Sequence, residues 1–234
     1  LRSATFSHVN PKTGNETVFS LARQVGDYIV IARKFLNEAD VVRATRSIHL
    51  PKFGFSEYPF KDLITPRNAE QVKAWENFED APEGVLNLAC GKGKTVLALK
   101  KIAQRKQHAV VLVNNAGLLE QWIDRAKEFL GLTDDEIGIV RGSKEEWDKP
   151  LVIAMIHTVA KRAATGKVPM AVRRKFGTVI FDEVHHLSAA TFLETADLFF
   201  GKRYGLSATP KREDGLEPVY YAHVGDIFYT DLKG

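Results

Sequence analysis

Residues 88–95 read Leu-Ala-Cys-Gly-Lys-Gly-Lys-Thr, and this short stretch decides the fold. It follows an apolar run at 85–88 and leads into an amphipathic run at 95–104, so we expect a strand, a tight loop and a helix. The two glycines let the backbone wrap closely around an anion, toward which the first N–H groups of the helix point. The stretch therefore predicts a phosphate-binding loop, made by Cys90, Gly91, Lys92, Gly93, Lys94 and Thr95.

From about residue 63 onward, apolar strands alternate with helices. Strands are expected at 85–88, 110–113, 137–140, 151–154, 179–181 and 203–206, and helices at 68–78, 95–104, 118–129, 158–164, 171–176 and 189–199. Uninterrupted apolar strands between helices indicate an α/β fold whose parallel sheet is covered on both faces and binds ligands at its carboxyl ends. Residues 1–60 instead show turn signals between short β-prone runs at 17–19 and 28–31, which predict a small β-rich N-terminal domain ahead of residues 61–234.

The composition narrows the class of protein. Hydrophobic residues make up 44% and charged residues 26%, as in soluble globular proteins, and no apolar run approaches the roughly 20 residues of a membrane helix. The single cysteine excludes an internal disulfide, and no secretory signal is visible, so we expect a cytoplasmic or nuclear protein that is not secreted. A net charge of +4 favours anionic partners without identifying one. The chain starts at Leu1, which suggests a fragment.

A second motif follows the predicted strand at 179–181. Asp182 at the strand end can hold Mg²⁺, together with the hydroxyl of Thr95, and Glu183 can orient and polarise an attacking water. His185 and His186 come shortly afterwards and raise the alternative of a zinc site. Neighbouring side chains diverge, however, and the one cysteine lies in the phosphate loop, which argues against zinc.

A third motif, Gly-Leu-Ser-Ala-Thr-Pro at 205–210, follows another predicted strand. The order of the three motifs resembles motifs I, II and III of superfamily 2 helicases, over residues 63–229. The Leu-x-Cys-Gly-x-Gly-Lys loop, the Asp-Glu-Val-His box and the Arg-Glu-Asp run at 212–214 are similar to the xeroderma pigmentosum group B type and its phage and bacterial relatives.

This resemblance implies a RecA-like P-loop domain that uses ATP and Mg²⁺. Lys94, Asp182 and Glu183 would be catalytic, and His185, Ser207 and Thr209 would couple the nucleotide state to the nucleic acid. Gln71 would read adenine, although the arginine that relatives place three residues earlier is Asn68 here, with Arg67 one residue before it. Nucleic-acid contacts would come from Asn114, Asn115, Gly117, Arg141, His157 and Thr158. Loop polarity and helix capping remain equally good explanations for the last three.

The leading hypothesis is an ATP-dependent helicase or translocase motor domain that moves on double-stranded or branched DNA. The second RecA-like domain, which the resemblance implies as the source of arginine fingers, is expected to be missing, so these residues alone should be weakly active or inactive. Two alternatives differ in class. One is a DNA-binding module with a passive nucleotide platform and residues 1–60 as the reader. The other is a P-loop kinase, which leaves the second and third motifs unexplained. The residues alone do not separate DNA from RNA.

Some features favour ordinary structural roles. The basic runs at 100–101, 161–162 and 173–175 are typical of solvated helix faces, and the three tryptophans are typical of packing residues.

Overall fold

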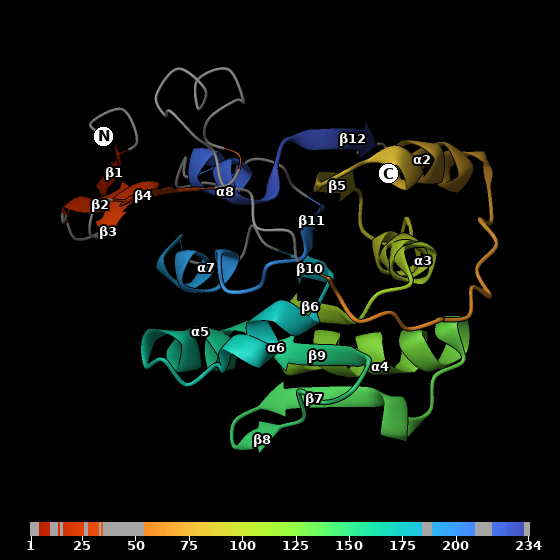
Figure 1. The fold of residues 1–234 in the computed structure, drawn as a ribbon. Helices are drawn as coiled ribbons and strands as arrows, with labels where there is room; N and C mark the ends of the chain where they lie inside the picture. The colour runs from red at the N-terminus through yellow and green to blue at the C-terminus, as the bar shows by residue number, and fades with distance from the viewer. Residues whose placement is uncertain are drawn as a thin grey trace.

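The structure is a computed structural model that describes residues 5–9, 14, 16–25, 28–32, 34, 54–183, 189–208 and 217–231. Its centre is an eight-stranded sheet with the order β12-β5-β11-β10-β6-β9-β7-β8 (Figure 1). The strands are β5 (Gly84–Leu88), β6 (Ala109–Val113), β7 (Ile137–Arg141), β8 (Lys144–Glu145), β9 (Leu151–Met155), β10 (Thr178–Asp182), β11 (Lys202–Ser207) and β12 (Ile227–Asp231). All neighbours are parallel except β7 and β8. The prediction of an α/β fold with a parallel sheet is confirmed for seven of the eight strands, and the short edge strand β8 departs from it by running antiparallel to β7.

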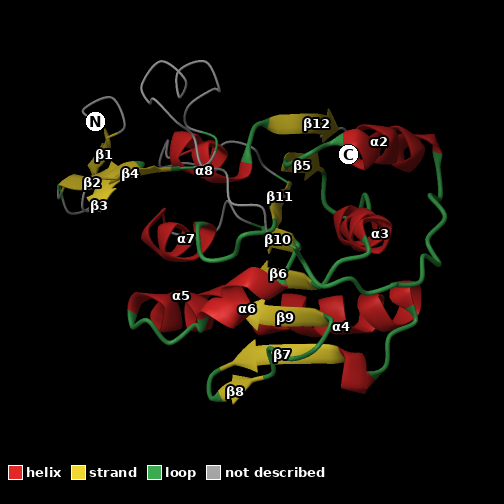
Figure 2. Ribbon diagram, viewed as in Figure 1, coloured by secondary structure: helices red, strands yellow, loops and turns green. Residues whose placement is uncertain are grey.

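Helices cover both faces of this sheet (Figure 2). They are α2 (Ala69–Asp80), α3 (Lys94–Arg105) and α4 (Ala116–Leu130) in one core, and α5 (Ile156–Ala164), α6 (Met170–Lys175), α7 (Ala189–Ala196) and α8 (Glu217–Val224) on the other side. Successive side chains of a strand point to opposite faces of the sheet, so β6 contributes to both cores. Val111 and Val113 pack with α3 and α4, whereas Val110 and Leu112 face the opposite side. This explains why every residue of β6 is buried and apolar.

Most expected elements are present, but the sequence reading missed some. The short helix α8, the 3₁₀ turn η2 (Asp134–Glu136) and the strands β8 and β12 were not predicted. β12 lies at the sheet edge with a register shift between Ile227 and Tyr229, and its residues are only partly buried, so it lacks the continuous apolar run of a central strand. The helix expected at 189–199 ends at Ala196, because Leu198 and Phe199 turn back into the core.

The N-terminal part contains two separate antiparallel hairpins. β1 (Thr5–Val9) pairs with β2 (Glu16–Ser20), and β3 (Ala22–Val25) pairs with β4 (Tyr28–Ile31). These strands include the two runs that were read as β-prone. The backbone N–H of Lys34 then donates to the carbonyl of Ala222 in α8 at 2.7 Å, which joins this segment to the sheet-bearing part.

Residues 54–67 lie along the sheet-bearing part rather than with the hairpins. The backbone of Tyr58 bonds to the carbonyl of Lys106, and Phe60 and Ile64 are buried in the core formed with α2, α3 and α4. The segment ends at Asn68, whose side-chain oxygen accepts from the backbone N–H of Gln71 at 2.9 Å and begins α2. None of the helices within the described residues has the length and apolar content needed to cross a membrane.

Candidate active site

The phosphate loop connects β5 to α3, as the sequence predicts. Gly91 and Gly93 have φ angles of 78° and 92°, a backbone region that favours glycine. A Cβ atom at Gly93 would also lie 2.5 Å from the Nε2 atom of Gln71, so a larger residue would have to displace the Gln71 amide. Gly93 is the N-cap of α3 and provides no side-chain cap, which leaves the first N–H groups of the helix for an anion.

Lys94 is buried beneath this loop. Its Nζ atom donates to the carbonyl oxygen of Leu88 at 2.9 Å and lies 3.7 Å from a carboxylate oxygen of Glu183. Leu88 stands where the strict phosphate-loop pattern has its first glycine, and its side chain is part of the core. The loop therefore uses the backbone carbonyl of this residue, which is the same for leucine and glycine, to hold the lysine.

Asp182 ends β10 with its side chain 3% exposed. The indole N–H of Trp122, on α4, donates to its Oδ2 atom at 2.7 Å. Burial raises the pKa of Asp182 to about 6, although the hydrogen bond from Trp122 and the charge of Lys94 lower it, and the charge of Glu183 raises it further. A carboxylate whose negative charge is so poorly compensated favours a bound cation.

The residues present fit Mg²⁺ better than a metal enclosed by protein ligands. Among the described residues, no group of three or more His, Cys, Asp or Glu side chains could hold a metal ion. Mg²⁺ commonly takes one or two carboxylates and completes its shell with phosphate oxygens and water. Asp182 and the hydroxyl of Thr95, which line the same cavity, could supply the protein part of such a shell.

Glu183 follows Asp182 with a φ of 50°, an uncommon value for a residue other than glycine. Such conformations store roughly 1–3 kcal/mol of strain and are concentrated at functional sites. The turn places the carboxylate of Glu183 next to Lys94 and at the wall of the nucleotide-sized cavity.

That cavity has a volume of about 530 Å³, within the range of small-molecule sites. It brings together all but one of the predicted catalytic and ATP-binding residues, namely Gln71, Cys90, Gly91, Gly93, Lys94, Thr95, Asp182 and Glu183. Its remaining lining comes from the segment before α2 (Thr65 and Arg67), from Val96 in α3 and from one face of α4 (Leu118, Gln121, Arg125, Glu128 and Phe129). Apart from Arg67, the sequence did not indicate these residues. Lys92 is the exception among the predicted ATP contacts. Its side chain pairs with Glu70 at 2.9 Å and does not line the cavity.

Gln71 is buried between the phosphate loop and the segment before α2. Its Nε2 atom donates to the carbonyl of Lys92 at 3.1 Å, and its Oε1 atom accepts from the backbone N–H of Arg67 at 2.9 Å. Asn68, at the position where relatives have an arginine, caps α2, whereas Arg67 lines the cavity. The geometry places Gln71 at this cavity, and its role in reading adenine stays a prediction.

The residues predicted to contact nucleic acid fall into two places. Asn115 caps α4 by accepting from the backbone N–H of Leu118 at 2.9 Å, and it donates to Asn114 at 2.8 Å. His157 and Thr158 line a second cavity of about 530 Å³, together with Gly142, Glu145, Lys161, Arg162, Thr165 and Lys167. Arg141 does not line this cavity and lies 4.0 Å from Glu120, and neither Asn114, Asn115 nor Gly117 reaches it.

Two of the basic pairs are not plain solvated faces. The Arg162 side chain is 11% exposed, donates to the carbonyl of Gly142 at 2.8 Å and pairs with Glu145 at 2.6 Å. Lys101 is 4% exposed and donates to the carbonyls of Phe78 and Glu79, which end α2, at 3.0 and 2.7 Å. The expectation of a solvated face was wrong for Arg162 and Lys101, whereas Lys161 is exposed, because the exposure of each side chain depends on what packs against it.

The coupling residues are only partly placed. Ser207 ends β11, next to β10, and is buried. His185, His186, Thr209 and the run at 212–214 lie outside the described residues.

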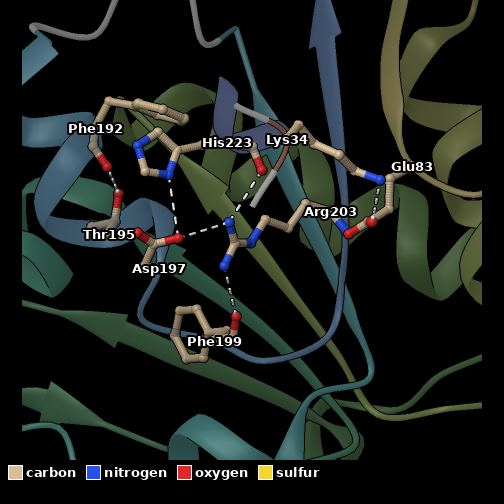
Figure 3. A network of polar contacts seen from close by, with 8 residues as sticks. All are labelled: Lys34, Glu83, Phe192, Thr195, Asp197, Phe199, Arg203 and His223. Carbon is tan, nitrogen blue, oxygen red and sulfur yellow. Dashed lines mark hydrogen bonds and ion pairs between the residues drawn. The ribbon is translucent and has the colours of Figure 1, made fainter. Parts of the chain in front are cut away.

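The opposite end of the sheet carries a polar network that the sequence did not reveal (Figure 3). Arg203, near the start of β11, donates to Asp197 at 2.9 Å and to the carbonyl of His223 at 3.1 Å. His223 lies 3.2 Å from the same oxygen of Asp197, and Glu83 pairs with Lys34 at 3.0 Å. The spacing of Arg203, Asp197 and His223 in the sequence matches no known motif. Their contact therefore becomes visible only in the folded structure.

Comparison with known proteins decides the family. Residues 63–212 match the family model described as "Type III restriction enzyme, res subunit". The chain belongs to this family. It is 35% identical over 161 residues to "DNA 3'-5' helicase XPB" of Kineococcus radiotolerans, covering 68% of this chain and 29% of that protein. It is 35% identical over 172 residues to "DNA 3'-5' translocase XPB2" of Sulfurisphaera tokodaii, covering 72% and 36%.

Two further comparisons cover more of the chain. A "putative ATP-dependent RNA helicase" of Acanthamoeba polyphaga mimivirus is 27% identical over 232 residues, covering 94% of this chain and 42% of that protein. The "UvsW helicase from Bacteriophage T4" has the same fold, with a TM-score of 0.56 and 16% identity over 86% of this chain and 70% of that one. The resemblance to superfamily 2 helicase motor domains of the XPB type is thus confirmed. The chain spans only 29% to 42% of the curated relatives named here.

Proposed function

We propose that this motor domain binds ATP with Mg²⁺ and hydrolyses it to drive a helicase or translocase on DNA. The observation that carries the proposal is the convergence of Lys94, Thr95, Asp182 and Glu183, from two segments far apart in the sequence, on one cavity of about 530 Å³. A passive platform would have no need to bury an under-compensated carboxylate beside a strained glutamate, which favours catalysis over the binding-module alternative.

Each residue has a role that follows from its position. Lys94, now held by the Leu88 carbonyl, would turn its charge toward the β and γ phosphates. Thr95 and Asp182 would hold Mg²⁺, which, when bound, supplies neutralisation of charge on the phosphate oxygens. Glu183 would accept a hydrogen bond from the attacking water and polarise it. Gln71 and the loop residues Cys90, Gly91, Lys92 and Gly93 would bind the rest of the nucleotide.

The nucleic-acid partner is proposed to be double-stranded or branched DNA. Two relatives that are named as a DNA helicase and a DNA translocase support this choice, whereas the mimivirus relative is named as an RNA helicase. The track would run over Asn114, Asn115 and Gly117 at the start of α4, then past Arg141 to the cavity of His157 and Thr158. Backbone N–H groups and basic side chains suit contacts to phosphates rather than to base edges. His185, Ser207 and Thr209 would relay the nucleotide state to this track.

The remaining organisation is also a proposal. The small β-rich domain predicted for residues 1–60 would end before residue 54, because residues 54–60 pack with the sheet-bearing part, and it would recognise DNA. The two antiparallel hairpins support its β-rich character. A second RecA-like domain of a longer protein would supply the arginine fingers, in line with the small share of each relative that the chain spans. The single cysteine favours the cytoplasm or nucleus as its location.

The test is a pair of titrations on the chain itself. Binding of a fluorescent ATP analogue should require Lys94 and be strengthened by Mg²⁺, and binding of forked DNA should exceed binding of a matched RNA. Loss of nucleotide binding in Lys94→Ala, without loss of folding by circular dichroism, supports the assignment. Equal nucleotide affinity in the wild type and Lys94→Ala would refute it.

A further inference from the structure

Trp122 has no role in the proposed hydrolysis, yet its side chain contacts Asp182 directly. It lies in α4 with no exposed surface, and its indole N–H donates to Oδ2 of Asp182 at 2.7 Å, a contact between residues 60 positions apart. We propose that Trp122 is a positioning residue, which fixes the carboxylate of Asp182 for its metal ion and connects it to the nucleic-acid end of α4. This inference rests on the proposed role of Asp182 in the site.

The hydrogen bond suits that task for two reasons. An indole N–H is a donor only, so it can orient a carboxylate without competing for the cation. Because the indole binds Oδ2, it does not itself occupy the other oxygen, Oδ1. Lys94 donates to a backbone carbonyl rather than to Asp182, and within the described part of the chain the other hydrogen bond to this carboxylate comes from the backbone of Glu183. Among the described side chains, Trp122 is therefore the one that sets its orientation.

The position of Trp122 on its helix gives the contact a second consequence. α4 begins at the Asn115 cap, in the proposed nucleic-acid track, and Trp122 lies about two turns further along. Leu118 and Gln121 of the same helix line the nucleotide cavity. A helix is a stiff element, so a shift of its first turn when DNA binds would change the position of the indole relative to Asp182. Coupling of this kind is reciprocal, so Mg²⁺–nucleotide should also change the affinity for DNA.

Pure packing is the competing explanation, and the chain offers a matched control for it. Trp147 is also a buried tryptophan, and its indole nitrogen has no hydrogen-bond partner among the described residues. It packs against Phe176 and Phe199 on the other side of the sheet. Trp147→Phe makes the same change in side-chain size as Trp122→Phe, but it removes no contact to the site.

The experiment measures how the affinity of a fluorescent ATP analogue depends on Mg²⁺ in the wild type, Trp122→Phe and Trp147→Phe, with and without forked DNA. Loss of a side chain that orients a metal ligand typically costs 10–100-fold in metal affinity, so Trp122→Phe should need roughly tenfold more Mg²⁺. Its affinity for the analogue in EDTA should stay unchanged, and DNA should no longer shift the Mg²⁺ dependence. Trp147→Phe should behave as the wild type. An unchanged Mg²⁺ dependence in folded Trp122→Phe would overturn the inference.

A second measurement covers the case in which Trp122→Phe does not fold. The chain has three tryptophans, so ¹⁵N-indole labelling of the wild type gives three signals, which Trp75→Phe and Trp147→Phe assign by elimination. The Trp122 signal should move when Mg²⁺ is added to the nucleotide complex, and a signal that stays in place would overturn the inference. If the wild type shows no Mg²⁺-dependent nucleotide binding at all, the proposed function fails with it. If the wild type shows Mg²⁺-dependent nucleotide binding but the Trp122 signal does not move, only the positioning role is refuted.

Discussion

The two ends of the sheet treat buried charge in opposite ways. At the amino end, the side chain of Asp197 is 48% exposed, and its partial burial would raise its pKa, but the hydrogen bond with His223 and the charge of the buried Arg203 outweigh this effect and lower the pKa to about 2. At the carboxyl end, burial outweighs the hydrogen bond from Trp122, and the pKa of Asp182 rises to about 6. The amino end is thus neutralised by its own chain, whereas the carboxyl end keeps a deficit of positive charge that a cation can fill.

The glutamates show the same contrast. Glu83 at the amino end lies 3.0 Å from Lys34 (Figure 3). It also lies 3.7 Å from Lys202 and accepts from the backbone N–H of Arg203 at 3.2 Å. Glu183 at the carboxyl end lies 3.7 Å from Lys94 and faces the nucleotide cavity. We conclude that the polar residues at the amino end hold β5, β11 and α8 together. Those at the carboxyl end are arranged to bind a ligand. Variants whose effects on stability and on activity are measured separately can test this contrast between the two ends of the sheet.

The largest effect is expected at the carboxyl end. Glu183→Gln keeps the shape of the side chain but removes the carboxylate that polarises water, which should reduce ATP turnover by roughly 10²–10⁴-fold. Binding of the ATP analogue should stay near that of the wild type. Turnover is measured by phosphate release, with the proposed second motor domain present. Normal turnover in this variant would show that Glu183 is not the activating group.

At the amino end, the expected loss is in stability. Arg203→Met removes a buried cation that contacts Asp197, the carbonyl of His223 and the carbonyl of Phe199. Breaking a buried ion pair by removing one partner costs about 3–5 kcal/mol, and the half-exposed carboxylate of Asp197 places the expected loss at the lower end, about 3 kcal/mol. Urea unfolding measures this value. The comparison is wrong if Arg203→Met lowers nucleotide affinity while the free energy of unfolding stays unchanged.

One helix spans both environments. α3 starts with Lys94 at the phosphate loop. Two turns later along α3, Lys101 donates to the carbonyls of Phe78 and Glu79, in the last turn of α2. Burial, followed by the charge of Arg105, lowers the pKa of Lys101 to about 8 from the usual 10.5, although Asp80 and Glu79 raise it. Between these values the unfolded chain binds more protons, so the contribution of Lys101 to stability increases with pH.

Lys101→Met has no titrating group at this position and serves as the reference for the effect. From pH 7.5 to pH 9.5, the free energy of unfolding of the wild type should rise relative to this variant by about 2 kcal/mol at most. Other groups titrate equally in both proteins and cancel in the difference. A difference that falls with pH would mean that the charged form of Lys101 is the favoured one in the folded protein.

These residues also show how far the sequence can predict the molecule. The phosphate loop, six strands and the pairing of Asp182 with Lys94 in one site could be predicted, because apolar runs, glycines and strand ends are local signals. The contact of Trp122 with Asp182 could not, since nothing in the sequence indicates which buried groups meet across 60 positions. The burial of Lys101 depends on where α2 ends, and that position is set by tertiary packing rather than by the lysine pair.

The smallest expected effect concerns the second cavity, which also lies at the carboxyl ends of its strands, after β7 and β9. Lys161 lines it beside His157 and Thr158, so Lys161→Gln should remove about one phosphate contact. Affinity for DNA should fall about two- to fivefold at low salt, and the slope of log affinity against log salt should decrease by about 1. Lys127→Gln is the matched control, because Lys127 pairs with Asp134 at 2.6 Å and lines neither cavity. Fluorescence anisotropy across salt concentrations gives both values. If the two variants change the slope equally, the second cavity contributes only general charge, and the track must be assigned to the first turn of α4 alone.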